Sequence, residues 1–339
     1  MRIKSAYIEI TNACNLNCQT CYNRSGMNAA PREIPLARIQ ETARFLWENG
    51  CAILSLSGGE PFLHSEIDDV LRWMHNEKEH CFALVSNGTL LTKNQIGLIA
   101  QSPNIALQIS LDGPDEVINA KTRGCGSFSK TLTTVNSLCE NGKAVTLRMV
   151  VSKLNHESVE RFYRMAIRLK CESSFGFVTK QGRGSDHWEN LDLSVSERMD
   201  VVHTIRRLNQ EYDLKVEEPG CTYKCALTDP DDEWHILIKS NGSFQPCQSL
   251  YREDFSLGSI DCLDAQALMF RAQHIAQIAR EREKKDFMCH NCLLDGICGK
   301  GCMAAAVDRT GDCYGNDGEC MFRKVLFLNN TFQKHRNNL

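Results

Sequence analysis

The sequence predicts an α/β protein: a partial (β/α)6 barrel of the TIM type over residues 1–216, then a small cysteine-rich domain over residues 217–339. In the first two thirds, six strand-like segments alternate with six helix-like segments, which indicates a parallel sheet with right-handed crossovers. Polar loops follow four successive predicted strands. The chain has 18 cysteines, most of which gather at residues 14–21 and again at 221–320.

The six predicted strands are short apolar runs rich in β-branched and aromatic residues. They cover residues 6–10, 52–56, 82–85, 105–111, 145–151 and 175–178. The six predicted helices have apolar residues at helical spacing. They cover residues 36–49, 67–76, 93–100, 128–140, 159–169 and 196–211. Gly50 and Asn141-Gly142 are stop signals for two of them, and Ser196 is a start signal for the last.

A domain boundary is expected near Glu217-Glu218-Pro219-Gly220. Beyond it the alternation of strands and helices disappears and the cysteine density rises. One helix is expected in this second domain, over residues 263–283.

The composition is that of a soluble protein. Charged residues make up 24% and hydrophobic residues 42% of the 339 residues, and the net charge is -3. This balance excludes the strongly basic pattern of nucleic-acid binders. The N-terminus carries no signal peptide and no apolar run is long enough to span a bilayer, so we expect a cytoplasmic protein without a membrane partner.

Clustered cysteines in a chain without an export signal indicate metal sites rather than disulfides. Four isolated cysteines, Cys51, Cys81, Cys139 and Cys171, lie mostly in apolar segments and are expected to be buried thiols.

The first cysteine group is Cys14-x3-Cys18-x2-Cys21, directly after the first predicted strand. Three thiolates this close together can hold three corners of a [4Fe–4S] cluster and leave the fourth iron open to a small molecule.

Three further polar loops follow the next three predicted strands. They are Gly58-Gly59-Glu60-Pro61, Ser86-Asn87-Gly88-Thr89 and Ser110-Leu111-Asp112-Gly113. Because chemistry in barrels gathers at the carboxyl ends of the strands, we expect all four loops to meet at one rim.

The cysteine run, followed by Gly58-Gly59-Glu60 after the second strand, resembles the radical S-adenosylmethionine (SAM) enzymes. A C-x3-C-x2-C run alone also suits a zinc loop; the second motif in this position makes zinc improbable. The resemblance implies that SAM chelates the open iron and is cleaved to methionine and a 5′-deoxyadenosyl radical.

The resemblance also implies SAM contacts. Gly58 and Gly59 would let the backbone approach the ligand, and Glu60 would accept a hydrogen bond from the SAM ammonium. Three other contacts are expected: Ser110 and Asp112 with the ribose, Arg123 with the carboxylate, and Tyr22 with adenine. The family places an aromatic residue just before the third cysteine, where this chain has Thr20, so Tyr22 is a departure from the pattern.

The C-terminal cysteines resemble the SPASM extension, which binds auxiliary iron–sulfur clusters. The resemblance implies two auxiliary [4Fe–4S] clusters, hence three clusters in all. The first would be held by Cys221, Cys225, Cys247 and Cys302, and the second by Cys289, Cys292, Cys298 and Cys320. Cys313 is a spare that could replace Cys320, and structural zinc is the alternative for these pairs.

Enzymes of this type mostly modify peptides, so the resemblance implies a crosslink or oxidation in a ribosomally made precursor. A sulfatase maturase is demoted because Gln248 stands where that branch has Asp. The sequence also leaves open a small-molecule radical enzyme and a non-catalytic zinc scaffold. The expected partners are a peptide, an electron donor such as a flavodoxin or ferredoxin, and a separate leader-peptide-binding protein, since the chain starts directly at its first strand.

No acid or base stands out in the sequence. Asp186 and His187 follow the sixth strand and are expected in a solvated loop. Cys313 is a weaker candidate for returning a hydrogen atom to a substrate radical.

Overall fold

The computed structural model describes residues 2–27, 31–228, 233–283 and 287–336. Its centre is a nine-stranded sheet with the order β6-β5-β4-β3-β2-β1-β7-β8-β9. Strands β1 to β6 are parallel and pair in sequence order, which confirms the predicted α/β partial barrel. The sheet strands are β1 (Arg2–Thr11), β2 (Ile53–Gly58), β3 (Cys81–Ser86), β4 (Ile105–Ser110), β5 (Val145–Val151) and β6 (Glu172–Phe177).

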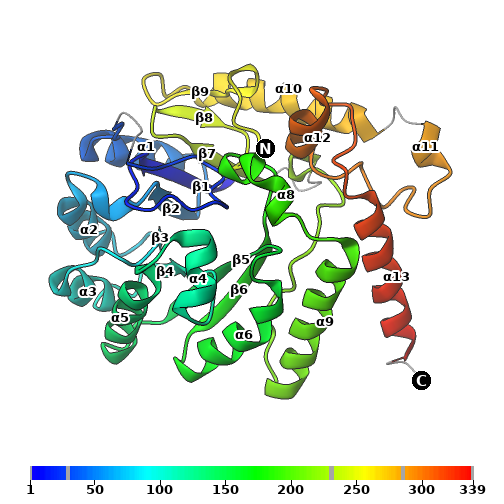
Figure 1. Cartoon of the computed structure of the whole chain (residues 1–339). Coiled ribbons are helices and arrows are strands. Elements are labelled where there is room, and N and C mark those ends of the chain that lie inside the picture. The colour runs from blue at the N-terminus through cyan, green and yellow to red at the C-terminus, as the bar shows by residue number, and fades with distance from the viewer. Residues whose placement is uncertain (1, 28–30, 229–232, 284–286, 337–339) are drawn as a thin grey trace.

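All six predicted helices are present, and in Figure 1 they follow one another around the outside of the sheet. They are α1 (Leu36–Glu48), α2 (Ile67–Asn76), α3 (Lys93–Ala100), α5 (Ser127–Glu140), α6 (Val159–Arg168) and α9 (Val195–Tyr212). The start of α9 differs by a residue from the expectation: Ser194, not Ser196, is its N-cap and forms a capping box with Glu197.

Within residues 1–216, three short helices were not predicted. They are α4 (Glu116–Arg123), α7 (Arg183–Asp186) and α8 (Trp188–Leu191). Their length leaves little periodicity to detect, although Asp115 caps α4 by accepting from the Ile118 N–H. Two of them, α4 and α7, lie in segments that contact the cysteine loop.

The core of the barrel is apolar and continuous. Leu54, Leu56, Leu84, Leu107 and Leu147 come from successive strands and all have 0–3% exposure. Such near-continuous burial is expected for a parallel sheet covered by helices. The barrel therefore gives a rigid base for the loops at its carboxyl rim.

The four isolated cysteines differ in burial. Cys51 and Cys171 are buried, as expected, and Cys139 is half-buried. Cys81 is exposed, so the prediction of a buried thiol is wrong there. Cys81 is the first residue of β3, and its exposure shows that the apolar run of this strand becomes buried only from Phe82 onward.

The C-terminal region returns to the same sheet, which the sequence analysis did not anticipate. Strand β7 pairs with β1 in parallel, and two short antiparallel strands extend the sheet beyond it. The C-terminal elements are β7 (Glu233–Ile238), β8 (Ser243–Gln245), β9 (Gly258–Ser259), α10 (Ala265–Glu283), α11 (Phe287–His290), α12 (Met303–Thr310) and α13 (Cys320–Arg336). Helix α10 matches the helix that was expected here, but the expectation of a single helix is wrong, because α11, α12 and α13 are also present.

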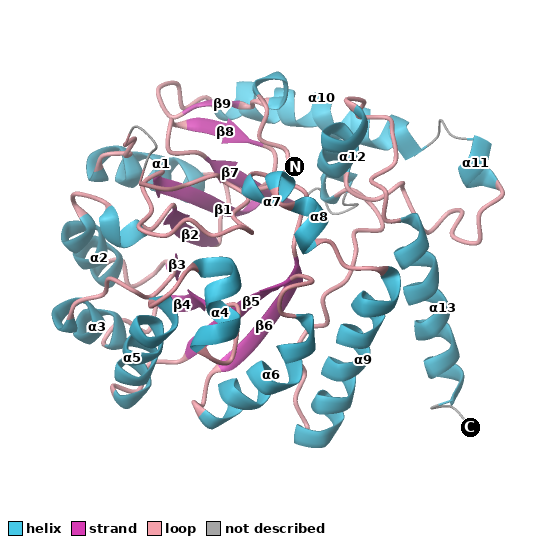
Figure 2. Ribbon diagram, in the orientation of Figure 1, coloured by secondary structure: helices cyan, strands magenta, loops and turns pink. Residues whose placement is uncertain are grey.

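The expected boundary at residues 216 and 217 falls in an irregular segment after α9 and stays a prediction. Figure 2 shows α10, α12 and α13 grouped beside the β7 end of the sheet and α9. A small apolar cluster of Met199, Val202, Phe322 and Leu326 joins α9 to α13. Among the described residues, no helix is both long and apolar enough to cross a membrane.

Candidate functional site

A cavity of about 570 Å³ opens at the carboxyl ends of the barrel strands. Its lining includes residues from all four polar loops, which confirms that these loops meet at one rim. The members predicted as site residues are Cys14, Cys18, Cys21, Tyr22, Gly58, Gly59, Ser110 and Arg123. The other two predicted SAM contacts, Glu60 and Asp112, lie behind this lining with 0% exposure.

The loop that carries the three cysteines is locked against the loop after β2. The Gly59 N–H donates to Thr11 O at 2.8 Å, and the Glu60 N–H donates to Ala13 O at 2.7 Å. A Cβ on Gly58 would lie 2.1 Å from Thr11 O, and a Cβ on Gly59 would lie 2.1 Å from Ala13 O. The close approach made possible by the two glycines is therefore to the chain's own backbone, in addition to their place in the cavity wall.

Two more elements hold the first half of the cysteine loop. Asn15 donates to the Thr89 hydroxyl at 2.8 Å and accepts from the Asn87 amide at 2.9 Å. The Gln19 N–H donates to Thr122 O, at the end of α4, at 2.9 Å. The loops after β3 and β4 thus fix the segment between Cys14 and Cys21.

The loop after β6 holds the second half, a contact that the sequence analysis missed. Arg183 donates to Cys21 O from its N–H at 2.9 Å and to Cys18 O from Nε at 2.8 Å. Gly182 has φ +55°, and a Cβ there would lie 2.2 Å from Tyr22 O. The sequence shows Gly182 next to Arg183 in a polar segment, which could have indicated a close backbone contact. It does not indicate that the cysteine loop is the partner.

The cysteine thiols are chemically suited to a cluster. Burial raises the pKa of Cys14 to about 12 and raises that of Cys18, so both are neutral thiols until a metal displaces the proton. Arg123 acts in the opposite direction on Cys18 and favours its thiolate. Three thiols in one cavity wall with a guanidinium beside them fit an anionic iron–sulfur cluster.

No three His, Cys, Asp or Glu side chains in the described parts of the chain converge to hold a single metal ion. A zinc site needs ligands around one atom, whereas a cubane cluster binds each cysteine through a different iron. The assignment of Cys14, Cys18 and Cys21 to a cluster rather than to zinc stays a prediction.

Glu60 has three protein partners, and its contact with the SAM ammonium stays a prediction. Its carboxylate accepts from the Ser86 hydroxyl and the Asn87 N–H, both at 2.7 Å, and from the Phe62 N–H at 3.2 Å. Burial raises the pKa of Glu60 to about 7 although these donors lower it. In this structure Glu60 ties the β2 loop to the β3 loop rather than facing the cavity.

Asp112 also has protein partners, and its contact with the ribose stays a prediction. Its Oδ2 lies 2.9 Å from Nε of Arg123, and its carboxylate accepts from the Thr122 hydroxyl at 3.0 Å and the Val150 N–H at 2.9 Å. The Arg123 side chain is 10% exposed and reaches the cavity. Asp112 thus orients Arg123, while Ser110 faces the cavity directly.

Tyr22 lines the cavity, and its hydroxyl lies 3.5 Å from Glu9 Oε1. Glu9 is fully buried, and burial raises its pKa. Contact of Tyr22 with adenine stays a prediction. Asp186 is exposed, lies outside the cavity and forms an ion pair with Arg24. It was expected in a solvated loop, but it is the last residue of α7.

The auxiliary cysteines form two groups. Cys225, Cys247 and Cys302 line one cavity of about 400 Å³, in agreement with the first predicted set. Cys221 instead has Cys298 and the Arg323 guanidinium as electrostatic neighbours. Its assignment to the first cluster stays a prediction.

In the second group, Cys298 and Cys320 are both electrostatic neighbours of Arg323, whose Nη2 lies 3.7 Å from Cys320 Sγ. Cys313 packs against the apolar core. The assignment of Cys320, with Cys313 as the spare, stays a prediction. Cys289 and Cys292 are half-buried, and their role as ligands stays a prediction.

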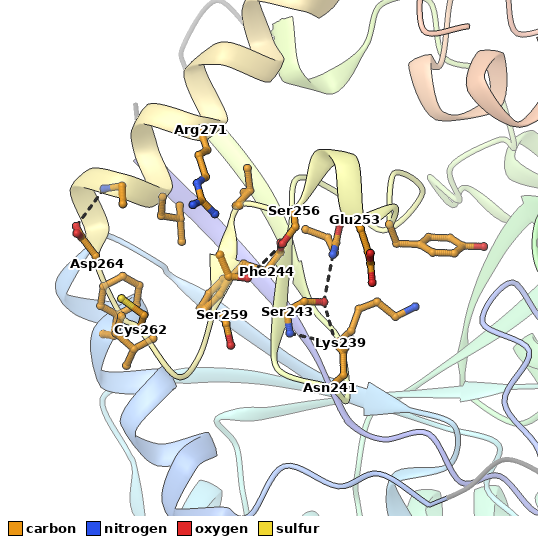
Figure 3. A pocket seen from close by; sticks show the side chains of 18 residues that line it. Lys239, Asn241, Ser243, Phe244, Glu253, Ser256, Ser259, Cys262, Asp264 and Arg271 are labelled. Atoms are coloured by element: carbon orange, nitrogen blue, oxygen red, sulfur yellow. Dashed lines mark hydrogen bonds between the residues drawn. The ribbon is translucent and has the colours of Figure 1, made fainter. Parts of the chain in front are cut away.

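A larger cavity, of about 650 Å³, lies elsewhere, between β8, β9 and α10 (Figure 3). Lys239, Glu253, Asp264 and Arg271 line it with mixed charge, and Cys262 is its one cysteine. It contains none of the predicted site residues, so its size alone does not make it the site.

Comparison with known proteins finds similarity to the family that the cysteine motif resembles. Residues 8–166 match the family model of the Radical SAM superfamily. The antilisterial bacteriocin subtilosin biosynthesis protein AlbA of Bacillus subtilis is 27% identical over 304 residues, which is 88% of this chain and 66% of AlbA. The mycofactocin maturase MftC of Mycolicibacterium smegmatis is 25% identical over 323 residues, 92% of this chain and 81% of MftC.

Among solved structures, Streptococcus suis SuiB bound to S-adenosylmethionine has a TM-score of 0.78. The identity is 18%, and the match covers 94% of this chain and 77% of SuiB. At this identity the likeness shows a shared fold. This chain spans just under two thirds of AlbA, so the activity of AlbA is not carried over as a finding.

The glycine contact can be tested by Gly59→Ala. The added Cβ would collide with Ala13 O, so we expect a loss of stability of about 1–3 kcal/mol and weakened cluster retention. Thermal unfolding and iron content after anaerobic reconstitution measure both effects.

The matched control is Gly97→Ala, in α3, where a Cβ meets nothing within 4 Å and the backbone is helical. Equal iron content in both variants would contradict the role given to Gly59.

Proposed function

We propose that this chain, which carries a radical SAM domain over residues 8–166, cleaves S-adenosylmethionine reductively and uses the resulting radical to modify a peptide. The observation that carries the proposal is the single cavity in which Cys14, Cys18 and Cys21 face Ser110 and Arg123. Thiols for a cluster and polar groups for a nucleoside and a carboxylate thus share one space.

A [4Fe–4S] cluster bound here supplies the electron that splits the sulfonium of SAM into methionine and a 5′-deoxyadenosyl radical. The chain's own residues supply position. Arg123, oriented by Asp112, offers a fixed cation for the SAM carboxylate, and Ser110 offers a hydroxyl for the ribose. Gly58 and Gly59 hold the cysteine loop in the wall of the cavity that Ser110 and Arg123 also line, so a cluster bound by Cys14, Cys18 and Cys21 would share that cavity with them.

Support for a peptide substrate comes from the relatives. AlbA takes part in the biosynthesis of the bacteriocin subtilosin, and SuiB has been crystallised with its precursor peptide SuiA. We propose a ribosomally made precursor as the substrate class, with a separate electron donor such as a flavodoxin or ferredoxin and a separate leader-peptide-binding protein as partners.

Another cavity, of about 420 Å³ and adjoining that of the SAM site, offers a route for such a peptide. It lies between the loop after β6 and helix α12, and it shares Thr179, Gln181 and Ser249 with the cavity of the SAM site. Gln181 spans the junction, donating to Ser249 O at 2.9 Å and to Asp308 Oδ2 at 3.1 Å. A peptide that enters here reaches the cysteine loop without crossing the sheet.

The cluster assignment predicts the outcome of a triple substitution. Replacing Cys14, Cys18 and Cys21 by alanine removes the thiolates and should abolish 5′-deoxyadenosine formation under reductant. Liquid chromatography of anaerobic reactions with SAM and dithionite measures it. The control is Cys81→Ala, an exposed thiol at the start of β3, which should keep full formation. Undiminished cleavage by the triple variant would contradict the assignment.

Iron content distinguishes three iron–sulfur clusters from one cluster with structural zinc. We expect about twelve irons and twelve sulfides per reconstituted chain, since three cubane clusters hold four each. Elemental analysis also counts zinc, and two equivalents of zinc with only about four irons would mean that the C-terminal cysteines form structural zinc sites.

The peptide route predicts a selective defect in Thr179→Trp. Thr179 is exposed at the junction of the two cavities, so an indole there should narrow the passage without disturbing the core. Peptide modification should fall about tenfold or more, equivalent to ~1.4 kcal/mol, while SAM cleavage without peptide persists.

Mass spectrometry of a co-expressed precursor peptide measures the extent of peptide modification. A mass change of minus two units is expected for a crosslink or oxidation. The matched variant is Ala267→Trp in the 650 Å³ cavity, which should modify the peptide normally. The reverse pattern would move the peptide route to that cavity.

A further inference from the structure

Arg282, near the end of α10, is a buried cation with an unusual set of partners. Its side chain has 0% exposure and donates to four backbone carbonyls. It donates to Lys300 O and Gly301 O at 2.7 Å each, to Gly299 O at 3.3 Å and to Gly315 O at 2.9 Å. All five N–H groups of an arginine can donate, so this side chain is well suited to hold several carbonyls at once.

The three consecutive carbonyls belong to the short loop between Cys298 and Cys302. In the proposed assignment these two cysteines bind different auxiliary clusters, so the loop sets how the clusters lie relative to each other. The loop has left-handed backbone at Lys300, with φ 62°, and at Gly301, with φ 75°. Buried carbonyls in such a turn need donors, and Arg282 supplies them.

Arg282 has no carboxylate at ion-pair distance among the residues that the structure describes. Arg323 provides the contrast: it is equally buried but makes two hydrogen bonds of 2.7 Å to Asp317. A buried cation without a counter-ion is strongly unfavourable. Burial lowers the pKa of Arg282, and its electrostatic neighbours of opposite sign are the thiols Cys225 and Cys302 together with Asp317.

We infer that Arg282 is the counter-charge and positioning residue of the auxiliary cluster at Cys225, Cys247 and Cys302. The inference rests on the auxiliary clusters of the proposed function. An iron–sulfur cluster with its thiolates is anionic, so it supplies the negative charge that Arg282 lacks.

The consequence is a higher reduction potential for this cluster. Reduction adds one electron and one negative charge, and a fixed cation nearby stabilises the reduced state more than the oxidised state. The guanidinium stays protonated, so no proton moves with the electron. Arg282 thereby makes the cluster a better acceptor for an electron that leaves a substrate radical.

The test compares reconstituted full-length variants by electron paramagnetic resonance during a dithionite titration, with iron counted in each. Arg282→Met removes the charge and keeps a side chain of similar length. Arg282→Lys keeps the charge but loses the planar set of five N–H donors of the guanidinium. Arg271→Met, an exposed arginine on the same helix, is the matched control. In Arg282→Met the equilibrium constant for reducing one auxiliary cluster should fall about tenfold, which is ~59 mV for one electron. The lysine variant should stay within about threefold, because a unit charge is retained.

Iron loss from Arg282→Met alone, with the lysine variant fully loaded, also supports a counter-charge. An unchanged potential in a fully loaded Arg282→Met overturns the inference and leaves the clusters standing. Equal iron loss in both variants overturns it too, because a purely structural fork would give that pattern. Only about four irons in the unaltered protein would instead remove the auxiliary clusters of the proposed function, and this inference with them.

Discussion

The contact between two backbone loops controls the rest of the site. The loop after β1 carries the three cysteines, and the loop after β2 presses its two glycines against it, with room for no side chain between Gly59 and Ala13 O. Parallel pairing of β1 with β2 brings these loops to the same rim. The remaining loops then add hydrogen bonds at Asn15, Gln19 and Arg183. A short, otherwise irregular segment is thereby held in one conformation before any ligand arrives.

The buried ionisable side chains of the site and of the C-terminal region also have defined partners. Glu60 and Asp112 lie behind the cavity wall, where each fixes a neighbour, and Arg123 is the group that reaches the cavity. In the C-terminal region Arg323 and Asp317 neutralise each other, whereas the partners of Arg282 in the described part of the chain are backbone carbonyls. The polar groups behind the cavity lining orient their neighbours, and those in the lining are available to a ligand.

Much of this could be predicted from the sequence, for physical reasons. Alternating apolar runs and amphipathic helices fix the order of a parallel sheet, and the order fixes which loops share a rim, so Cys14, Cys18, Cys21 and Ser110 were placed correctly. Side-chain direction was not accessible, so the sequence did not show that Glu60 binds Ser86 and that Asp112 binds Arg123; the SAM contacts expected for both stay predictions. Long-range contacts such as Arg183 with Cys21, and the return of β7 beside β1, depend on tertiary packing that no local pattern encodes.

We expect the cluster at Cys14, Cys18 and Cys21 to keep one iron free for SAM. Electron paramagnetic resonance of the reduced protein tests this directly when all eight proposed auxiliary ligands are changed to alanine: Cys221, Cys225, Cys247, Cys302, Cys289, Cys292, Cys298 and Cys320. One cluster should remain, and its signal should shift when SAM is added. A signal that is identical with and without SAM would mean that all four irons already have ligands, and no iron would then be open to SAM.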